Sequence, residues 1–218
     1  MNKIVAIDGP AGSGKGTMSA KIVDAYHIAH ISTGDMFRSA IADQTPVGIE
    51  AKGYIEKGQL VPDDVTDRMV KERISQDDCL NGYLLDGYPR NIHQAQAIEV
   101  MSTDINRPIE CVINLVVDYD LLIRRITGRR MCKQCGEIYH IDSKPPKVEG
   151  ICDLCGGELY QRSDDNEKEL QVRYEIYEKE TAPVIDYFRE KGLVKDVNAA
   201  QDVELVFKEV MDILEAVK

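Results

Sequence analysis

The sequence predicts an α/β fold built on a parallel, doubly wound sheet of five strands, and three observations support this prediction. Short apolar runs alternate with stretches of helical pattern, as in a parallel sheet with helices on both faces. The first apolar run breaks into glycines and restarts as a helix, which is the layout of a phosphate-binding loop (P-loop). Two longer stretches interrupt the alternation. We therefore expect two insertions at the edge of the sheet where the carboxyl ends of the strands bind ligands.

The expected strands are short and apolar, and they lie at residues 4–8, 29–32, 83–86, 112–117 and 193–197. The first helix should span about 14–26, directly after the glycine-rich loop. The last helix should span about 201–217, because apolar residues recur there at helical spacing. These residues are Val206, Val210, Ile213, Leu214 and Val217.

The glycine-rich loop at residues 9–17 reads GPAGSGKGT. Its glycines let the backbone close around an anion without Cβ clashes, and Lys15 supplies a mobile positive charge. The pattern G-x-x-x-x-G-K-[ST] is met up to Lys15, but the next residue is Gly16 and the hydroxyl comes at Thr17. We therefore predict a variant phosphate-binding loop; the alternative is a glycine-rich turn with a chance lysine.

Composition limits the classes of partner. The chain has 218 residues and a formal net charge of −11, which argues against a broad surface for nucleic acid or anionic membranes. No apolar run approaches the roughly 20 residues of a membrane span, and the N-terminus lacks the layout of a signal peptide. We expect a cytoplasmic protein that binds neither nucleic acid nor membranes and acts as a monomer.

The first expected insertion, at 33–60, has a helical pattern with glycine interruptions. A new helix should restart with Asp63 as its N-cap. The interrupting glycines are Gly48, Gly53 and Gly58, and the apolar row of the new helix is Val65, Met69 and Ile74. The second expected insertion, at about 128–165, is rich in Gly, Pro and Cys and has little helical pattern.

Four cysteines of the second insertion form two C-x2-C knuckles separated by 16 residues, and each knuckle is followed by a glycine. This spacing predicts a tetrahedral zinc site of four thiolates, structural because no ligand position stays open. A pair of disulfides is the alternative, which a cytosolic setting disfavours. We leave His140 out of the site and expect Cys79 and Cys111 to be buried packing residues. The zinc ligands are Cys132, Cys135, Cys152 and Cys155.

Arginines lie beside the breaks in the sheet, although the chain is acidic. The fork of a guanidinium suits phosphate oxygens and keeps its charge when buried. Ordinary surface ion pairs are the alternative for any single arginine. As a set, beside a phosphate-binding loop, they indicate polyphosphate substrates. They are Arg38, Arg90, Arg124, Arg125, Arg129, Arg130, Arg162 and Arg173.

Five separated motifs carry a family resemblance. They are GKGT at 14–17, STGDMFR at 32–38, LLDGYPR at 84–90, RITGRR at 125–130 and QRSDDNE at 161–167. In this order, and with the cysteine knuckles, the chain resembles adenylate kinases of the long bacterial form, whose lid binds zinc. The resemblance implies a core domain at 1–31, 62–127 and 166–218, an AMP-binding insertion (the helical NMP-binding insertion) at 32–61 and a zinc-stapled lid at 128–165.

The resemblance also implies a reaction, ATP and AMP to two ADP, with Mg2+ on the ATP. Its implied catalytic residues are Lys15, Arg90, Arg129, Arg162, Arg173 and Asp86, the last orienting water on Mg2+. ATP would meet Gly12, Ser13, Gly14, Lys15, Gly16, Thr17, Arg125, Arg129, Ile138, Tyr139 and, at its adenine, Gln201. AMP would meet Thr33, Arg38, Gln59, Leu60, Val61, Gly87, Tyr88, Pro89, Arg90, Gln94, Arg162 and Arg173. Asp164 would brace the closed lid.

Two alternatives stay open at the level of sequence. The order Pro10-Ala11 in the loop looks like the opening of a bacterial cytidylate kinase, so a kinase for CMP or UMP is one of them. Thr33 with Gln94 favours adenine instead, as the resemblance implies. The second alternative is a non-catalytic, nucleotide-sensing zinc protein.

Overall fold

The central sheet has five parallel strands in the order β2-β3-β1-β4-β8. We describe it from a computed structural model that covers residues 3–217. The strands are β1 (Lys3–Asp8), β2 (Ala29–Ser32), β3 (Gly82–Asp86), β4 (Cys111–Val116) and β8 (Val194–Asn198). Each expected strand is confirmed to within one residue at either end. In register, Ile7 of β1 and Ser32 of β2 both pair with Asp86 of β3, so three strands end together.

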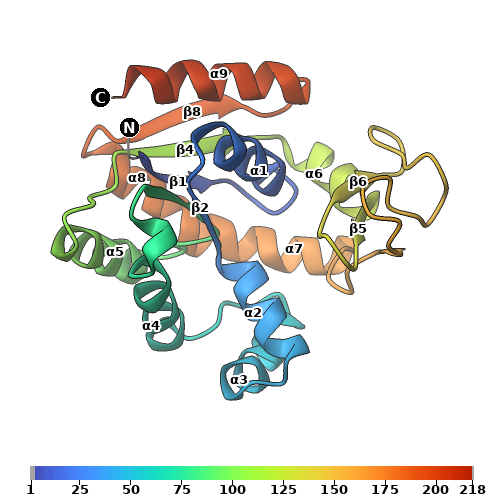
Figure 1. Cartoon of the computed structure of the whole chain (residues 1–218), viewed down its shortest axis with the longest axis horizontal. Helices are drawn as coiled ribbons and strands as arrows, with labels where there is room; N and C mark the ends of the chain where they lie inside the picture. The colour runs from blue at the N-terminus through green and yellow to red at the C-terminus, as the bar shows by residue number, and fades with distance from the viewer. Residues whose placement is uncertain (1–2, 218) are drawn as a thin grey trace.

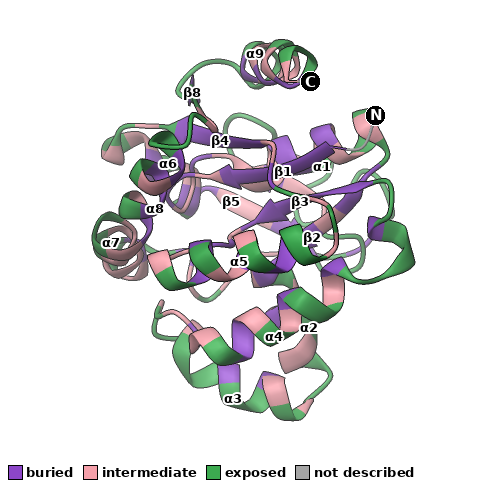
Figure 2. Cartoon of the chain, turned by 90° about the vertical axis from the view of Figure 1, so that its left-hand side faces the viewer, coloured by how far each residue is buried: buried purple, intermediate pink, exposed green. Residues whose placement is uncertain are grey.

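Helices cover both faces of this sheet (Figure 1). Alternate residues of β1 divide between the two faces: Val5 and Ile7 pack under α1 (Lys15–Tyr26) and α9 (Val203–Ala216), whereas Ile4 and Ala6 pack on the opposite side. The opposite side is covered by α4 (Asp63–Ile74), α5 (Ile92–Asp104) and α8 (Ala182–Arg189). Strands β1, β3 and β4 are therefore buried between two layers of helices, whereas most residues of the edge strand β8 are exposed (Figure 2).

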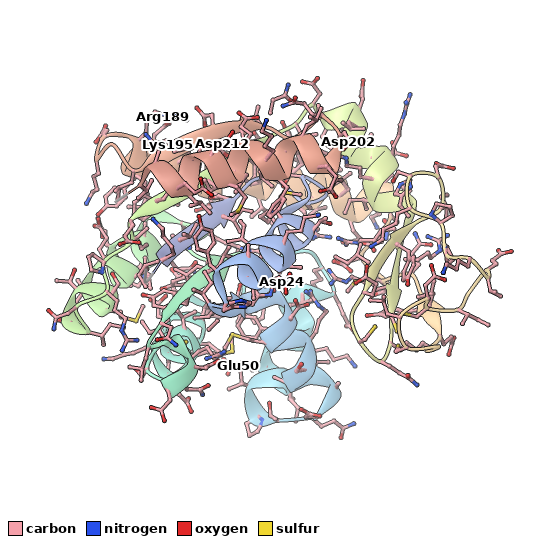
Figure 3. The ribbon with its side chains drawn as sticks, turned by 45° about the horizontal axis from the view of Figure 1, so that its top comes forward. Asp24, Glu50, Arg189, Lys195, Asp202 and Asp212 are labelled. Atoms are coloured by element: carbon pink, nitrogen blue, oxygen red, sulfur yellow. The ribbon has the colours of Figure 1, made fainter. Side chains whose placement is uncertain are left out.

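The last helix is amphipathic. Its N-cap Asp202 and its residue Asp212 are exposed (Figure 3), while Val206, Val210 and Leu214 are buried against the sheet. The predicted apolar row of this helix is thus confirmed. Within residues 3–217, no helix is both long and apolar enough to cross a membrane.

The first insertion forms α2 (Thr33–Ala42) and α3 (Pro46–Ile55), which project from the sheet (Figure 1). The predicted interruptions at Gly48 and Gly53 are wrong, because both residues lie inside α3. The break comes at 43–45, where Thr45 caps α3 by accepting the Gly48 N–H at 3.1 Å. A Cβ on Gly48 would lie 2.0 Å from the carbonyl oxygen of Ala40, so this glycine permits close packing of the two helices.

The prediction that Asp63 is the N-cap of the next helix is also wrong. Pro62 occupies the cap position, and Asp63 is the first residue of α4. Its carboxylate instead accepts hydrogen bonds from the side chains of Asn91 at 2.8 Å and Gln94 at 2.7 Å. The carboxylate is therefore committed to tertiary contacts with α5 rather than to its own helix.

The second insertion contains a small antiparallel sheet in the order β6-β5-β7. Its strands are β5 (Arg129–Cys132), β6 (Ile138–His140) and β7 (Leu159–Tyr160), entered from α6 (Tyr119–Thr127) and left through α7 (Glu167–Ile176). The short turn η1 (Asp77–Cys79) and the π-helical η2 (Tyr177–Thr181), between α7 and α8, complete the elements of the described residues. The sequence predicted little regular structure in this insertion because these strands are only two to four residues long.

Candidate active site

The glycine-rich loop joins the end of β1 to the start of α1. Gly12 and Gly14 have φ angles of 86° and 103°, in the left-handed region that favours glycine. A Cβ on Gly9 would lie 2.7 Å from Ser13 Oγ and 2.8 Å from the carbonyl oxygen of Leu115. The loop thus needs its glycines, and it precedes the N-terminus of a 12-residue helix, where anions are stabilised.

Lys15 lies in this loop with its ammonium group turned toward the backbone. Its Nζ donates to the carbonyl oxygens of Gly9 at 2.5 Å and Pro10 at 3.0 Å. Burial lowers the pKa of Lys15 to about 8, although the nearby negative charges of Asp86 and Asp8 raise it. A phosphate group in the loop would add negative charge beside the ammonium and so help to offset its loss of hydration.

Asp8 is a residue of this site that sequence reasoning missed. It ends β1, and its carboxylate accepts the Gly9 N–H at 2.5 Å. Burial raises the pKa of Asp8 to about 6, although the nearby Lys15 lowers it. An acidic residue directly before a phosphate-binding loop was the available signal.

Asp86, the expected partner of Mg2+, ends β3 beside the loop. It is buried, and its Oδ2 accepts from Ser19 Oγ at 3.4 Å and lies 3.4 Å from His30 Nε2. Both contacts are long for hydrogen bonds. The carboxylate therefore remains available to a hydrated cation on bound phosphates, a use that suits the oxygen ligands Mg2+ prefers.

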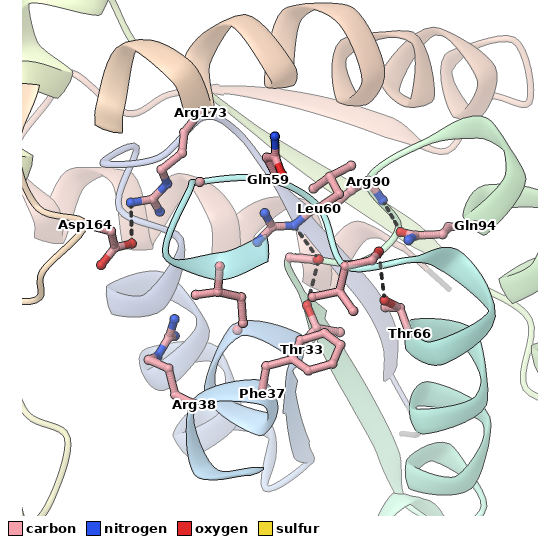
Figure 4. Close-up of a pocket in the computed structure, with 15 residues that line it drawn as sticks. Thr33, Phe37, Arg38, Gln59, Leu60, Thr66, Arg90, Gln94, Asp164 and Arg173 are labelled. Atoms are coloured by element: carbon pink, nitrogen blue, oxygen red, sulfur yellow. Dashed lines mark hydrogen bonds and ion pairs between the residues drawn. The ribbon is translucent and has the colours of Figure 1, made fainter. Parts of the chain in front are cut away.

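A second pocket lies between the first insertion and the sheet (Figure 4). Thr33 Oγ1 and Arg90 Nε both donate to the carbonyl oxygen of Gly87, each at 2.8 Å. The pocket brings together nine of the residues expected at AMP, which are Thr33, Arg38, Gln59, Leu60, Val61, Gly87, Arg90, Gln94 and Arg173. Lining residues that sequence reasoning missed are Gly34, Phe37, Ile55, Gly58 and Thr66.

Three residues expected at AMP, which are Tyr88, Pro89 and Arg162, lie outside this lining. Tyr88 is buried, and its hydroxyl donates to Asp67 Oδ1 at 2.7 Å, so its side chain anchors the motif rather than facing the pocket. Pro89 follows it and is likewise absent from the lining. Arg162 lines a neighbouring cavity between α2, α3 and the second insertion.

Arginines from three elements converge on these pockets, and each has a carboxylate partner. Asp35 Oδ1 lies 2.5 Å from Arg38 Nη2 and 3.6 Å from Arg162 Nη2. Arg173 pairs with Asp164 at 2.8 Å, and Arg129 Nε donates to Asp165 at 2.9 Å. Burial, together with the charges of Arg38 and Arg129, lowers the pKa of Arg162 to about 10. The cluster therefore holds more positive charge than its carboxylates balance, which favours polyphosphate anions.

The residues expected at ATP are only partly brought together. Arg125 donates to the carbonyl oxygens of Ser13 at 3.3 Å and Ala199 at 2.8 Å, so it links the phosphate-binding loop to the turn after β8. Ile138 Cδ1 lies 3.3 Å from where a Cβ on Gly16 would stand. Tyr139 is buried within the second insertion, with the Asp153 N–H donating to its hydroxyl at 2.8 Å. Gln201 is exposed and contacts Asn198.

The four knuckle cysteines gather at one point. Their sulfur atoms all lie within 4.8 Å of one another, with Cys132 and Cys155 at 3.4 Å and Cys135 and Cys152 at 3.6 Å. Tetrahedral thiolates at about 2.3 Å from zinc would be roughly 3.8 Å apart, so the donor set fits the metal. The glycines after the knuckles, Gly136 and Gly156, have φ angles of 75° and 74° as expected.

Other candidate ligands lie elsewhere. His140 Nε2 contacts the carbonyl oxygen of Arg124 at 3.1 Å, and its Nδ1 accepts the N–H groups of Asp142 and Ser143. Cys79 and Cys111 are fully buried in the cores of the main sheet, as predicted.

A phosphate-binding loop at the end of a parallel sheet, facing a second pocket across a shared set of arginines, defines a phosphotransferase that acts on two phosphorylated substrates. The comparisons with known proteins agree. The sequence model of the family "Adenylate kinase" matches residues 7–193, and the chain belongs to this family.

Relatives named adenylate kinase cover nearly the whole chain. The protein of Bacillus subtilis (strain 168) is 52% identical over 96% of this chain and 97% of its own length. The protein of Carboxydothermus hydrogenoformans is 50% identical over 96% of this chain and 98% of its own length. The protein of Thermodesulfovibrio yellowstonii is 48% identical over 95% of this chain and 96% of its own length. The predicted family is confirmed, and these matches favour neither a kinase for CMP or UMP nor a nucleotide-sensing zinc protein.

Proposed function

We propose that the chain transfers the γ-phosphoryl group of Mg-ATP reversibly to AMP, giving two ADP, through the residues described above. The observation that carries this proposal is that the two pockets adjoin at the carboxyl ends of β1 and β3. Asp86 ends β3 beside the phosphate-binding loop. The next residue, Gly87, lines the second pocket, where its carbonyl oxygen accepts from Arg90 Nε at 2.8 Å. Two phosphate groups bound in these pockets would meet at this junction.

In this proposal the loop residues 12–17 hold the ATP phosphates and Lys15 follows the transferred group. Arg125 and Gln201 lie toward the adenine of ATP, and Ile138 and Tyr139 cover the nucleotide from the second insertion. Thr33, Arg38, Arg90 and Gln94 hold AMP with the backbone at 59–61 and 87–89. Arg129, Arg162 and Arg173 neutralise the phosphates as the site closes.

The chemistry needs no protein base. The AMP phosphate is largely ionised near neutral pH because its second pKa is about 6, so its oxygen can attack directly. The chain's contribution is to hold the two phosphates in line, to balance their charge and to exclude water. Asp86 would hold Mg2+ through water, and the metal would supply charge neutralisation at the phosphates.

Three parts divide this work. The core at 1–31, 62–127 and 166–218 carries the loop, the insertion at 32–61 carries the AMP pocket, and the insertion at 128–165 is a lid stapled by structural zinc. We propose a monomer in the cytoplasm, without nucleic-acid or membrane partners, on the support of the net charge of −11.

The test is phosphoryl transfer from Mg-ATP to AMP, CMP, UMP and GMP, with the products resolved by chromatography. We expect AMP to be the efficient acceptor. Lys15→Ala and Arg90→Ala should each lower kcat/KM by about 100-fold or more, the loss expected for a group that stabilises charge in the transition state. Lys21→Ala is the matched control in the same helix, because Lys21 pairs with Glu204 at the surface. CMP as the best acceptor, or near-normal turnover by both site variants, would contradict the proposal.

A further inference from the structure

The amide of Gln94 is fixed from both sides. Gln94 lines the pocket assigned to AMP and has an exposed fraction of 2%. The backbone N–H of Arg90 donates to Gln94 Oε1 at 2.8 Å (Figure 4), and Gln94 Nε2 donates to Asp63 Oδ1 at 2.7 Å. The two anchors come from different parts of the chain, one from the turn after β3 and the other from the first turn of α4.

These two partners allow only one orientation of the amide. A backbone N–H can only donate and an ionised carboxylate can only accept. Reversing the amide would set donor against donor at Arg90 and acceptor against acceptor at Asp63. After both bonds are made, one N–H and one oxygen lone pair of Gln94 remain for a ligand.

We propose that Asp63 is a positioning residue that sets the choice of base, by fixing the orientation in which Gln94 meets the nucleoside monophosphate. Adenine offers a ring nitrogen that accepts beside an amino group that donates, which matches the remaining N–H and lone pair. A 6-oxopurine offers a ring N–H that donates beside a carbonyl that accepts, which matches only the reversed amide. This inference rests on the proposed function, since it concerns the acceptor site of that reaction.

A purely structural role of Asp63 is the competing explanation. Its carboxylate also accepts from Asn91 Nδ2 at 2.8 Å, and Asn91 Oδ1 caps α5 at the Gln94 N–H. The imidazole of His93 lies 3.5 Å from the second carboxylate oxygen. Asp63 therefore joins the starts of α4 and α5, and its removal could act through the helices alone.

The test compares kcat/KM for AMP and for inosine monophosphate, a 6-oxopurine nucleotide of the same size, in wild type and Asp63→Ala. Wild type should prefer AMP strongly, because a site built to hydrogen-bond one pattern rejects the other. In Asp63→Ala we expect the preference for AMP to fall about tenfold or more, with KM for AMP raised and KM for ATP little changed. Asp63→Ser, too short to reach Gln94, should repeat this result if the first variant folds poorly.

Three controls separate positioning from structure. Asp63→Asn should restore most of the preference, because its Oδ1 can accept both hydrogen bonds. Asp64→Ala removes an exposed acidic residue from the same helix turn and should leave the preference unchanged. Asn91→Ser keeps a capping oxygen but loses the bond to Asp63, and should also keep the preference.

An AMP preference unchanged in Asp63→Ala and Asp63→Ser would overturn the inference. So would an equal loss of preference in Asn91→Ser. Failure of wild type to phosphorylate AMP would instead overturn the proposed function, so the two failures are distinguishable.

Discussion

Asp8 shows how a single buried carboxyl can serve a site at the expense of stability. Its pKa rises to about 6 from an ordinary value of 3.8, because burial outweighs the attraction of Lys15. An acid whose pKa is higher in the folded state contributes stability that is complete below about pH 4 and is lost as the pH rises through about 6. At neutral pH the charged Asp8 therefore opposes folding of the free protein.

Asp8→Asn should for this reason stabilise the protein at neutral pH. We expect the free energy of unfolding at pH 7.5 to rise by about 2–3 kcal/mol, and the gain to shrink toward zero as the pH falls to 4. Urea unfolding at several pH values measures it. Asp24→Asn, an exposed position of α1 labelled in Figure 3, is the control and should change little. A gain that is independent of pH, or a loss at pH 7.5, would contradict this account.

At the scale of residues, the sequence predicts the role of a side chain when that role depends on its local motif. Lys15 and Arg90 belong to such motifs, and the structure brings them to one junction. Asp63 was predicted to cap its own helix because only its neighbours in sequence were visible. Its partners, Asn91 and Gln94, lie 28 and 31 residues away, so tertiary contact decided its role.

The second insertion, at 128–165, has only a small core of its own. Its buried cluster consists of Cys132, Tyr139, Cys152 and Leu159, and two of these are knuckle cysteines. So small a cluster cannot offset the entropy of ordering about 38 residues. A zinc ion held by the four cysteines, as we propose, would therefore supply most of the stability of this element.

Removal of the metal should therefore unfold the lid before the main sheet. We expect one zinc per chain in freshly prepared protein, and chelation should abolish the hydrogen-exchange protection of β5 and β6 while β1 and β3 stay protected. Metal analysis and hydrogen exchange read by mass spectrometry measure these changes. Cys111→Ala, which removes a thiol from the main core, is the control and should retain the zinc. A zinc-free protein in which β5 and β6 keep their hydrogen-exchange protection would contradict the assignment of a structural metal.

The elements that the sequence predicted correctly differ in length and burial from those that it missed. The main strands were predicted within a residue because buried parallel strands are apolar runs bounded by turn residues. The strands of the lid are too short to show a period, and their pairing depends on the knuckles. The break between α2 and α3 was misplaced because Gly48 serves helix packing, which a local pattern cannot distinguish from a turn.

At the scale of the whole molecule, the candidate active site is a concentration of positive charge between the main sheet and the two insertions. Gathering like charges costs free energy, as Arg162 illustrates, because burial and the charges of Arg38 and Arg129 disfavour its charged form. Its Nε is buried and has no hydrogen-bond partner among the described residues. The nearby carboxylates of Asp35 and Asp164 offset this only in part, so bound phosphates would stabilise the charge further.

Arg162→Ala should accordingly separate stability from binding. We expect the thermal midpoint of the free variant to be equal to or above that of wild type, because an unfavourable buried charge is removed. The rise in midpoint on adding Mg-ADP, which would occupy both pockets in the proposed function, should be smaller than in wild type, because the bound state loses a phosphate partner. Thermal unfolding with and without Mg-ADP measures both quantities. Arg130→Ala is the control, since the Arg130 side chain donates to the backbone carbonyl oxygens of Thr127 and Arg129, and it should show the full rise. A free Arg162→Ala protein that melts well below wild type yet gains as much from Mg-ADP would show that Arg162 holds the lid and the insertion together rather than binding phosphate.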